Sequence, residues 1–342
     1  MKKRTRIILL TAGILLLIII SAGIYAYNAI FKPFDHPETV YIYIDEEKSY
    51  DKVIDQLQEK AGIPNERIFN LLADRMKYIN NIKTGRYAIK PGTTMLDAIR
   101  LLRSGVQEPV NLTFNNIRNM ESLAGRLSSQ LMADSLSLLE ALTNPDIAAG
   151  YGFNSQTFGA MFIPNTYQVY WDTSVKGLTD RMKKEYDAFW NSNRKKRAEE
   201  IGLTPLEVST LASIVEEEAT YADEYPIVAG LYLNRIKRGM RLEADPTVKF
   251  AVGDPTLRRI LFKHLEVESP YNTYKNDGLP PGPIRIPSIQ GIDAVLNPVS
   301  HNYLFMCAKD DLSGRHNFAV THAEHARNAR AYQRALNERR IY

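Results

Sequence analysis

The feature that most constrains this chain is a long uncharged stretch near its N-terminus. No residue from Ile7 to Phe31 is charged, and Ile7 to Ile20 is almost wholly aliphatic. A helix needs about 20 such residues to cross the hydrocarbon core of a membrane, whereas the apolar core of a cleavable signal peptide has about 7–15. We therefore predict a transmembrane helix over residues 7–28. Small residues within the stretch also fit a cleavage site, so a signal peptide stays an alternative.

The charges on either side of this stretch predict its orientation. Four basic residues precede it: Lys2, Lys3, Arg4 and Arg6. The next basic residue is Lys32, and no second apolar stretch reaches spanning length. Because cytoplasmic flanks of membrane spans are rich in Lys and Arg, we expect residues 1–6 in the cytoplasm and everything after about residue 30 outside. The prediction is a single-pass protein of the cytoplasmic (inner) membrane whose main part lies on the periplasmic side.

The composition of the remaining chain fits a folded globular protein. Hydrophobic residues make up 44% of the 342 positions, which is enough for a sizeable core. The formal net charge is +4, and the four N-terminal basic residues account for it, so the remainder is close to neutral. A nucleic-acid partner is therefore not expected. Cys307 is the only cysteine, which excludes an intramolecular disulfide.

Residues 39–108 are predicted to form a small module of alternating strands and helices. Alternating apolar residues predict strands, and apolar residues at helical spacing between turn signals predict helices. The predicted strands cover 39–44 and 84–89, and the predicted helices cover 49–61, 67–76 and 95–102. In layout this block resembles a LysM-like module, a fold that often contacts N-acetylated glycans. A spacer domain without a binding role is the alternative.

Residues 109–342 are expected to form a larger domain of mixed structure. The pattern predicts a strand over 110–114 and helices over 121–132, 135–142 and 178–190. Residues 150–174 are rich in aromatics, Gly and Asn, and we expect an irregular segment that forms surface there. The predicted fold class is thus α+β: an N-terminal transmembrane helix, a small α/β module and a larger mixed α+β domain.

The strongest local signal lies between Pro205 and Tyr225. Thr204 and Glu207 form a capping box, and Pro205 fits the first helical position. Since each residue advances about 100° around a helix axis, Leu211, Ile214 and Val215 share one face. This pattern predicts a helix with one apolar stripe.

Of the three consecutive glutamates in this helix, only Glu218 continues the apolar stripe. Glu216 points nearly opposite, and Glu217 lies on the flank. Burial of a carboxylate disfavours its charged form, so the pKa of Glu218 should be raised, as a general acid requires. The alternative is a structural glutamate paired with Arg235 or Arg241.

Several loop residues are candidates for the wall of a cleft. The segment 243–247 carries two acids and contributes Asp245 and Thr247. The segment 271–274 interleaves aromatic and amide groups that suit sugar faces, and it contributes Tyr271, Asn272 and Tyr274. Ordinary loop chemistry is the alternative for each of them.

The C-terminal histidines raise the question of a metal site. His316, His322 and His325 lie close together in sequence. A zinc site needs three or four ligands, and the His-x2-His spacing leaves one helix face short of ligands. Thr321 and Glu324 form another capping box, which places two of the histidines in a first helical turn. We predict no metal site here and expect a polar cap or an imidazole that lines a cleft.

The motifs of this chain resemble those of a known family, the endolytic murein transglycosylases, also called the YceG-like family. The matching motifs, in chain order, are FIPNTY (162–167), LASIVEEE (211–218), NR (234–235), MRL (240–242), DPTV (245–248), YNTY (271–274), GLPPGPI (278–284) and the pair His316 and Phe318. The resemblance implies that Glu218 is the catalytic glutamate. Asn165, within FIPNTY, becomes a weaker candidate for a substrate contact.

Some positions depart from the family pattern. Asn115-Asn116 stand where the family usually has Glu-Gly, Ala219 follows the catalytic position in place of Thr or Ser, and Ala326 replaces Asn. These changes put hydrogen-bonding roles at those positions in doubt. They leave Glu218 untouched.

The resemblance implies an activity and its partners. We expect an enzyme, a lyase that cleaves the MurNAc–GlcNAc bond within nascent peptidoglycan strands, forms 1,6-anhydro-MurNAc ends and limits strand length. The reaction needs no metal and no organic cofactor. Expected partners are glycan strands and the membrane, with cell-wall synthases as candidates. Two alternatives stay open: a muramidase-type hydrolase that uses Glu218 with Asp245 or Glu243, and a non-enzymatic glycan-binding scaffold.

Overall fold

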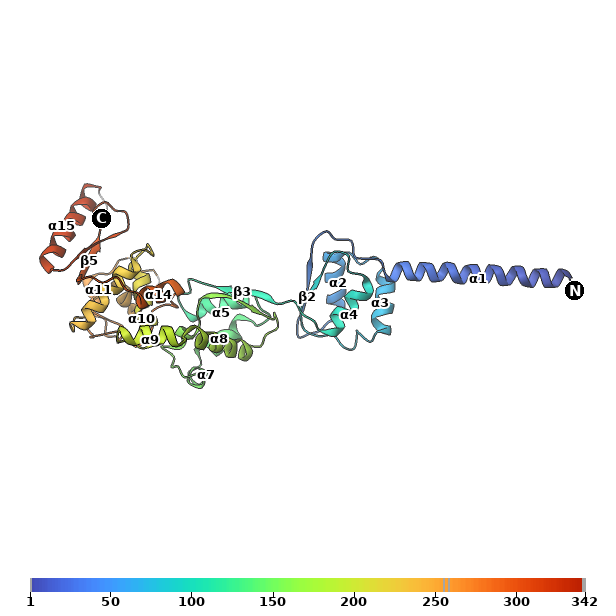
Figure 1. Ribbon diagram of the computed structural model, residues 1–342, viewed down its shortest axis with the longest axis horizontal. Coiled ribbons are helices and arrows are strands. Elements are labelled where there is room, and N and C mark those ends of the chain that lie inside the picture. The colour runs from blue at the N-terminus through green and yellow to red at the C-terminus, as the bar shows by residue number, and fades with distance from the viewer. Residues whose placement is uncertain (1, 255, 258, 340–342) are drawn as a thin grey trace. The chain divides into compact units, whose positions relative to one another are not determined.

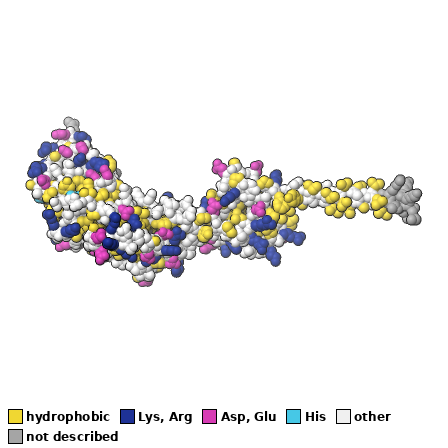
Figure 2. Space-filling model, viewed as in Figure 1, with side chains coloured by type: hydrophobic (Ala, Val, Ile, Leu, Met, Phe, Trp, Pro, Cys, Tyr) yellow, Lys and Arg dark blue, Asp and Glu magenta, His cyan; other side chains and the backbone are white. Residues whose placement is uncertain are grey.

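The computed structural model describes residues 2–254, 256–257 and 259–339 (Figure 1). Helix α1, Lys2–Ile30, is the N-terminal element, and its segment Ile7–Ile30 is long and apolar enough to cross a membrane. The aliphatic side chains from Ile7 onward are exposed, and Figure 2 shows them as a hydrophobic surface along the helix. The predicted apolar helix is therefore present, and its length and composition fit a membrane anchor.

Chain contacts divide the protein into two compact units. The first unit runs up to Asn111 and also takes in Gln130–Met132 and Gln168–Thr173. The second unit comprises Leu112–Ser129, Ala133–Tyr167 and the chain from Ser174 onward. Two short segments from later in the chain thus join the first unit, which the sequence pattern did not indicate.

The first unit contains a two-stranded sheet and three helices after α1. Their bounds are β1 (Val40–Ile44), α2 (Tyr50–Ala61), α3 (Glu66–Arg75), β2 (Gly85–Ile89) and α4 (Met95–Ser104). β1 and β2 pair antiparallel, from Val40 opposite Ile89 to Ile44 opposite Gly85. Buried side chains from both strands and all three helices form one core. The predicted elements match within a few residues, while the resemblance to LysM stays a prediction.

The remaining described chain is mixed helix and strand. Its elements are β3 (Val110–Phe114), α5 (Met120–Ser128), α6 (Ser135–Thr143), α7 (Pro145–Gly150), η1 (Phe158–Met161), β4 (Asn165–Val169), α8 (Val175–Phe189), α9 (Ser192–Glu200), α10 (Pro205–Glu218), α11 (Tyr225–Lys237), α12 (Asp245–Val252), α13 (Phe262–Leu265), α14 (Ile289–Leu296), β5 (Phe305–Ala308), β6 (His316–Ala319) and α15 (His322–Glu338). β3 pairs with β4, and β5 pairs antiparallel with β6. The α+β class is confirmed.

The aromatic segment 150–174 forms the irregular surface that its composition suggested only in part. It contains η1 and β4, and the six residues from Phe158 to Ile163 are all buried. The ring of Phe158 packs against Phe153 and Phe162, with centroids 6.2 and 5.5 Å apart. The aromatic rings supply core volume here, because large apolar side chains gain most when they are buried together.

Helix α10 is buried on all sides. Every residue from Val208 to Val215 is buried, and the helix packs against α11, α12 and α14. The prediction of a single apolar stripe was therefore wrong, since polar Ser209, Thr210 and Ser213 are buried too. Each of these hydroxyls donates to a backbone carbonyl one turn earlier in the helix. Such bonds let small polar side chains enter a core without an unpaired donor.

Helix α10 also ends earlier than the sequence pattern predicts. It ends at Glu218, and Ala219 is extended, with φ −103° and ψ 130°. A new helix, α11, begins at Tyr225. Pro226 fits the first turn of α11, where its missing N–H has no partner to lose, so it favours a new helix start at this point. The break places the Glu218 carboxylate at a helix end.

Candidate active site

Glu218 lies in a pocket of about 370 Å³. The pocket is lined by Glu218, Leu231, Tyr232, Arg235, Leu242, Glu243, Asp245, Tyr274, Phe305, Met306, Cys307, Ala308, His316 and His325. These residues come from the end of α10, from α11, from the segment leading into α12, from the 271–274 loop, from the β5–β6 hairpin and from α15. Glu218 is half-buried and lines this pocket, so its side chain can meet a ligand there.

The pKa of Glu218 is raised to about 7, and burial is the main cause. The negative charges of Asp245 and Glu217 raise it further. Tyr232 opposes this, since its hydroxyl donates a 2.9 Å hydrogen bond to Oε1 and so favours the ionised form. The predicted rise in pKa agrees in direction. Near neutral pH the side chain holds its proton for about half of the time, as a general acid requires.

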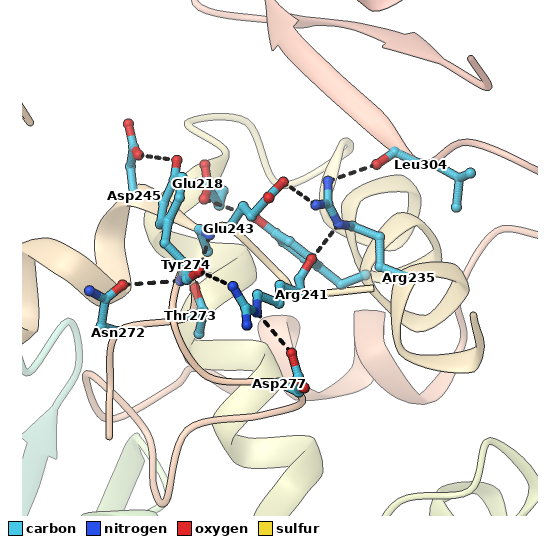
Figure 3. Close-up of polar contacts among 12 residues, drawn as sticks. Glu218, Arg235, Arg241, Glu243, Asp245, Asn272, Thr273, Tyr274, Asp277 and Leu304 are labelled. Atoms are coloured by element: carbon cyan, nitrogen blue, oxygen red, sulfur yellow. Dashed lines mark hydrogen bonds and ion pairs between the residues drawn. The ribbon is translucent and has the colours of Figure 1, made fainter. Parts of the chain in front are cut away.

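The alternative of a structural ion pair for Glu218 was wrong. Arg235 instead donates to the carbonyl of Arg241 at 2.7 Å, to the carbonyl of Leu304 at 3.1 Å, and to the carboxylate of Glu243 (Figure 3). Arg241 pairs with Asp277 at 2.9 Å. Both arginines are thus engaged with other groups, so neither holds the Glu218 carboxylate ionised.

Glu216 and Glu217 have partners of their own. The Glu216 side chain is 5% exposed; it accepts from the backbone N–H and the hydroxyl of Ser288, and Arg285 lies 3.6 Å away. Glu217 pairs with Arg285 at 2.7 Å. The Glu216 side chain is thus nearly as buried as the apolar residues of α10. Its partners lie about 70 residues later in the chain, which local periodicity does not reveal.

The burial of Glu216 predicts that a substitution there affects stability. Glu216→Gln should lower the free energy of unfolding by about 1–3 kcal/mol, because it removes a buried charge that Arg285 and Ser288 satisfy. The thermal midpoint measured by circular dichroism should fall by several degrees. Glu217→Gln, whose side chain is more exposed, should change the midpoint less. An unchanged midpoint for Glu216→Gln would contradict the structural role.

Asp245 and Tyr274 are the predicted contact residues that the structure brings to the pocket. The Tyr274 hydroxyl donates to Asp245 Oδ1 at 2.7 Å (Figure 3). Burial and the neighbouring carboxylates raise the pKa of Tyr274, so its hydroxyl keeps its proton. The pair therefore presents a polar edge beside Glu218.

The other four predicted contact residues lie elsewhere. Asn272 is fully buried and donates to the carbonyls of Leu265 and Val267 at 2.8 and 2.9 Å. Thr247 is also fully buried and bonds within the protein, to Ala244 and Thr273. These two shape the loops that carry Asp245 and Tyr274.

Tyr271 and Asn165 are nearer to the surface but do not line the pocket. Tyr271 packs against Phe250 with ring centroids 4.7 Å apart. Asn165 begins β4 and is exposed, and its side chain accepts from the backbone N–H of Thr166 at 2.8 Å. The structure therefore does not bring these two side chains to Glu218.

A larger cavity, of about 810 Å³, is less suited to chemistry. It is lined by residues of α6, α7 and α8, including Tyr151 and Asp180. Asp180 bonds to Lys176 and Tyr151, and these contacts lower its pKa. A carboxylate held in its ionised form does not serve as a proton donor, so the smaller pocket is the better candidate site.

Comparison with known proteins identifies the family of the chain. The sequence pattern of the YceG-like family matches residues 42–331. The chain belongs to the YceG-like family. A curated relative from Bacillus subtilis, named endolytic murein transglycosylase, is 28% identical over 324 residues, which cover 89% of this chain and 88% of the relative.

Two further relatives extend the comparison. A protein of the same name from Streptococcus pneumoniae is 27% identical over 309 residues. That alignment covers 79% of this chain and 54% of the relative, so this chain spans about half the length of the pneumococcal protein. A crystal structure of a YceG-like protein from Listeria monocytogenes is 26% identical, with a TM-score of 0.55, and the match covers 85% of this chain and 99% of that one.

Some residues of the site were not found from the sequence. Tyr232, the hydrogen-bond partner of Glu218, lies in an apolar part of α11. A buried tyrosine hydroxyl usually has a hydrogen-bond partner, so a tyrosine in an apolar helix was the signal that could have identified Tyr232. The strand β5 also lines the pocket, with all four of its residues, and it was not predicted from the sequence.

The three C-terminal histidines differ in exposure and in partners. His316 bonds to Glu224, His325 lines the pocket, and His322 is exposed. Burial lowers the pKa of His325, and the nearby charges of His322 and then Arg235 add to this effect. Among residues 2–254, 256–257 and 259–339, no three His, Cys, Asp or Glu side chains are placed to hold a metal ion.

Proposed function

We propose that the chain is an endolytic peptidoglycan lytic transglycosylase that cleaves the MurNAc–GlcNAc bond and forms 1,6-anhydro-MurNAc ends. The observation that carries this proposal is Glu218: a pocket carboxyl with a pKa of about 7, in a chain of the YceG-like family. Relatives named endolytic murein transglycosylase support the same reaction.

The proposed reaction uses Glu218 first as acid and then as base. Protonated Glu218 gives its proton to the glycosidic oxygen that leaves the anomeric carbon of N-acetylmuramic acid, and the bond between them breaks. The 6-hydroxyl oxygen of the same sugar then bonds to the anomeric carbon, and its proton returns to the Glu218 carboxylate. No water is consumed. Because the nucleophile is part of the substrate, its effective concentration is high.

Asp245 and Tyr274 are the proposed substrate contacts. Their hydrogen-bonded pair lines the same pocket as Glu218 and offers polar groups to an oxocarbenium-like transition state. A hydrolase would need a second carboxylate to activate water. Glu243 is engaged by Arg235, and Asp245 accepts from Tyr274, so each of these acids already has a partner. This arrangement favours the intramolecular reaction.

Product analysis tests the proposed function. Peptidoglycan is digested with the full chain in detergent, and the new muramyl ends are identified by mass spectrometry. We expect anhydro ends, which are lighter than reducing ends by one water molecule. A product mixture with reducing ends alone would show a muramidase, and no cleavage would favour a glycan-binding scaffold.

The proposed location follows from α1 and from the substrate. We infer that α1 anchors the protein in the cytoplasmic membrane with the catalytic unit outside, where peptidoglycan lies. The small module is proposed to hold glycan strands near the membrane, and strand cleavage there would limit strand length. Cell-wall synthases are proposed partners on the same grounds.

A reporter fusion tests the orientation. An enzyme reporter fused after Tyr342, active only outside the cytoplasm, should be active in cells, because four basic residues precede the apolar stretch. A matched fusion that is active only in the cytoplasm should be silent. The reverse result would exclude access to peptidoglycan and contradict the proposed location.

A further inference from the structure

The pocket that holds Glu218 is also lined by His316, which is paired with the buried carboxylate of Glu224. His316 begins β6 and lines the pocket, while Glu224 is the residue before α11. Glu224 is 5% exposed, and its carboxylate accepts two bonds from His316: one from the backbone N–H at 3.1 Å and one from Nδ1 at 3.0 Å. Glu224 therefore holds His316 at two points, its backbone N–H and the Nδ1 atom of its imidazole ring.

Nearby contacts fasten the same two segments together. Arg315 forms an exposed ion pair with Asp223 at 3.0 Å and lies 4.4 Å from the ring centroid of Tyr221. The hydroxyl of Tyr221 donates to the carbonyl of Ser313 at 3.0 Å. The β5–β6 turn is thus attached to the loop between α10 and α11. This loop follows directly after Glu218, so His316 and Glu218 are carried by connected segments.

The Glu224 carboxylate determines which imidazole nitrogen carries the proton. An ionised carboxylate only accepts hydrogen bonds, so Nδ1 must be the N–H donor. In the neutral ring this leaves Nε2 without hydrogen, as an acceptor. Within the described residues Nε2 has no hydrogen-bond partner, and the side chain is 13% exposed. Nε2 is therefore available to a ligand in the pocket.

We propose that His316 is a second catalytic residue, which takes the proton of the substrate 6-hydroxyl and passes it to Glu218. This inference rests on the proposed function. The glycosidic bond breaks as Glu218 protonates the leaving oxygen, and the 6-hydroxyl oxygen bonds to the anomeric carbon as its proton moves to Nε2. The imidazolium then gives this proton, through pocket water, to the Glu218 carboxylate. Protons balance, and no oxidant or further reactant is needed.

The pair has the features that this step requires. A base that holds the 6-hydroxyl orients its oxygen for attack, and orientation is a large part of the gain from intramolecular reaction. The ionised Glu224 stabilises the imidazolium that forms for a moment, as a carboxylate does in other histidine-based sites. Because Glu218 must be protonated at the start of the reaction, it is unable to hold the hydroxyl as a base at that stage.

Glu224→Gln is a sharp test, because it keeps the hydrogen bonds and reverses one of them. The glutamine carbonyl still accepts from the backbone N–H of His316. Its amide N–H must donate to Nδ1, which moves the proton of the neutral ring to Nε2. If His316 has only a structural role, this change should leave kcat unchanged. If Nε2 acts as a base, kcat should fall, because Nε2 now carries the proton. His316→Ala removes the base outright, and Asp223→Asn is the matched control at the neighbouring exposed carboxylate.

The experiment measures kcat, KM, product ends and thermal midpoint for the full chain and these variants on purified glycan strands. We expect kcat to fall on the order of 100-fold in both Glu224→Gln and His316→Ala, with KM changed less than about threefold. Added imidazole should restore part of the His316→Ala activity. The share of reducing ends among the products should also rise in these variants. Water should attack the anomeric carbon more often when His316 no longer orients the 6-hydroxyl. Asp223→Asn removes only one exposed ion pair of the attached turn, so it should lower kcat by less than about threefold.

Two results would overturn the inference. The first is an unchanged kcat in Glu224→Gln. The second is a fall in kcat in the variants that is fully explained by a smaller fraction of folded protein. The unsubstituted chain reports on the proposed function separately. If it makes anhydro ends and the variants do too at full rate, only the role of His316 fails; if it makes none, the proposed function fails first.

Discussion

Glu218→Gln is expected to abolish formation of anhydro-muramyl ends, with kcat lowered by at least about a thousandfold. Glutamine keeps the shape of the side chain and its bond from Tyr232, but it has no proton to give to the leaving oxygen. Glu217→Gln should stay within about tenfold of the unsubstituted chain, since Glu217 pairs with Arg285 outside the pocket lining. An active Glu218→Gln protein would reject Glu218 as the acid.

The same substitution should stabilise the protein, and the gain should depend on pH. The pKa of Glu218 rises from 4.5 in the unfolded chain to about 7 in the folded one. A raised carboxyl pKa has no effect on stability below about pH 4.5, weakens the fold between there and pH 7, and has its full effect above. The full effect is on the order of 3 kcal/mol. The thermal midpoint of Glu218→Gln should exceed that of the parent by several degrees at pH 8 and match it at pH 4.5.

Arg235→Leu is expected to cause the largest loss of stability among the pocket residues. The guanidinium is almost completely buried, and it donates to Glu243 and to two backbone carbonyls. Leucine would leave these acceptors without their donor, which costs about 3–5 kcal/mol. The thermal midpoint, measured by calorimetry, should fall by roughly 10 °C.

Arg241→Leu is the matched control for Arg235→Leu. Its ion pair with Asp277 is exposed, and such pairs contribute about 1 kcal/mol or less. The midpoint should therefore fall by only a few degrees. An equal fall in the thermal midpoint of the two variants would contradict this prediction. It would show that the burial of Arg235 does not determine its contribution to stability.

The elements of the small module were predictable because their signals are local. Capping side chains at Ser49, Asn65 and Thr94 each accept a hydrogen bond from the first helical turn. Gly62 and Gly105 end two helices in the left-handed conformation, which glycine adopts at little cost. Helix ends with such markers can be placed within a residue or two. The apolar periodicity between them supplies the rest.

The surroundings of Glu218 were harder to predict because distant segments create them. Periodicity identified Glu218, but α10 is buried on every side, and Glu216 is buried too. The chemical difference between the two arises from Ser288 and Arg285 at Glu216 and from Tyr232 at Glu218. These partners come from elements that only the fold brings together.

Loop residues show the same limit. Asp245 and Thr247 are two positions apart, yet one lines the pocket and the other is fully buried. Likewise, Tyr274 lines the pocket, whereas Asn272 is fully buried. The residue types suited a glycan cleft in all four cases, but side-chain direction in a loop depends on its tertiary contacts. The sequence therefore identified the loops of the site more securely than the residues that face it.

Digestion in heavy-oxygen water tests the central claim most directly. The proposed reaction closes the anhydro ring with the sugar's own 6-hydroxyl, so the new muramyl ends should contain no heavy oxygen. A hydrolase would place one oxygen atom from water at each new end. Mass spectrometry of the unsubstituted chain's products decides between them: unlabelled anhydro ends are the expected result, and labelled reducing ends throughout would contradict the account.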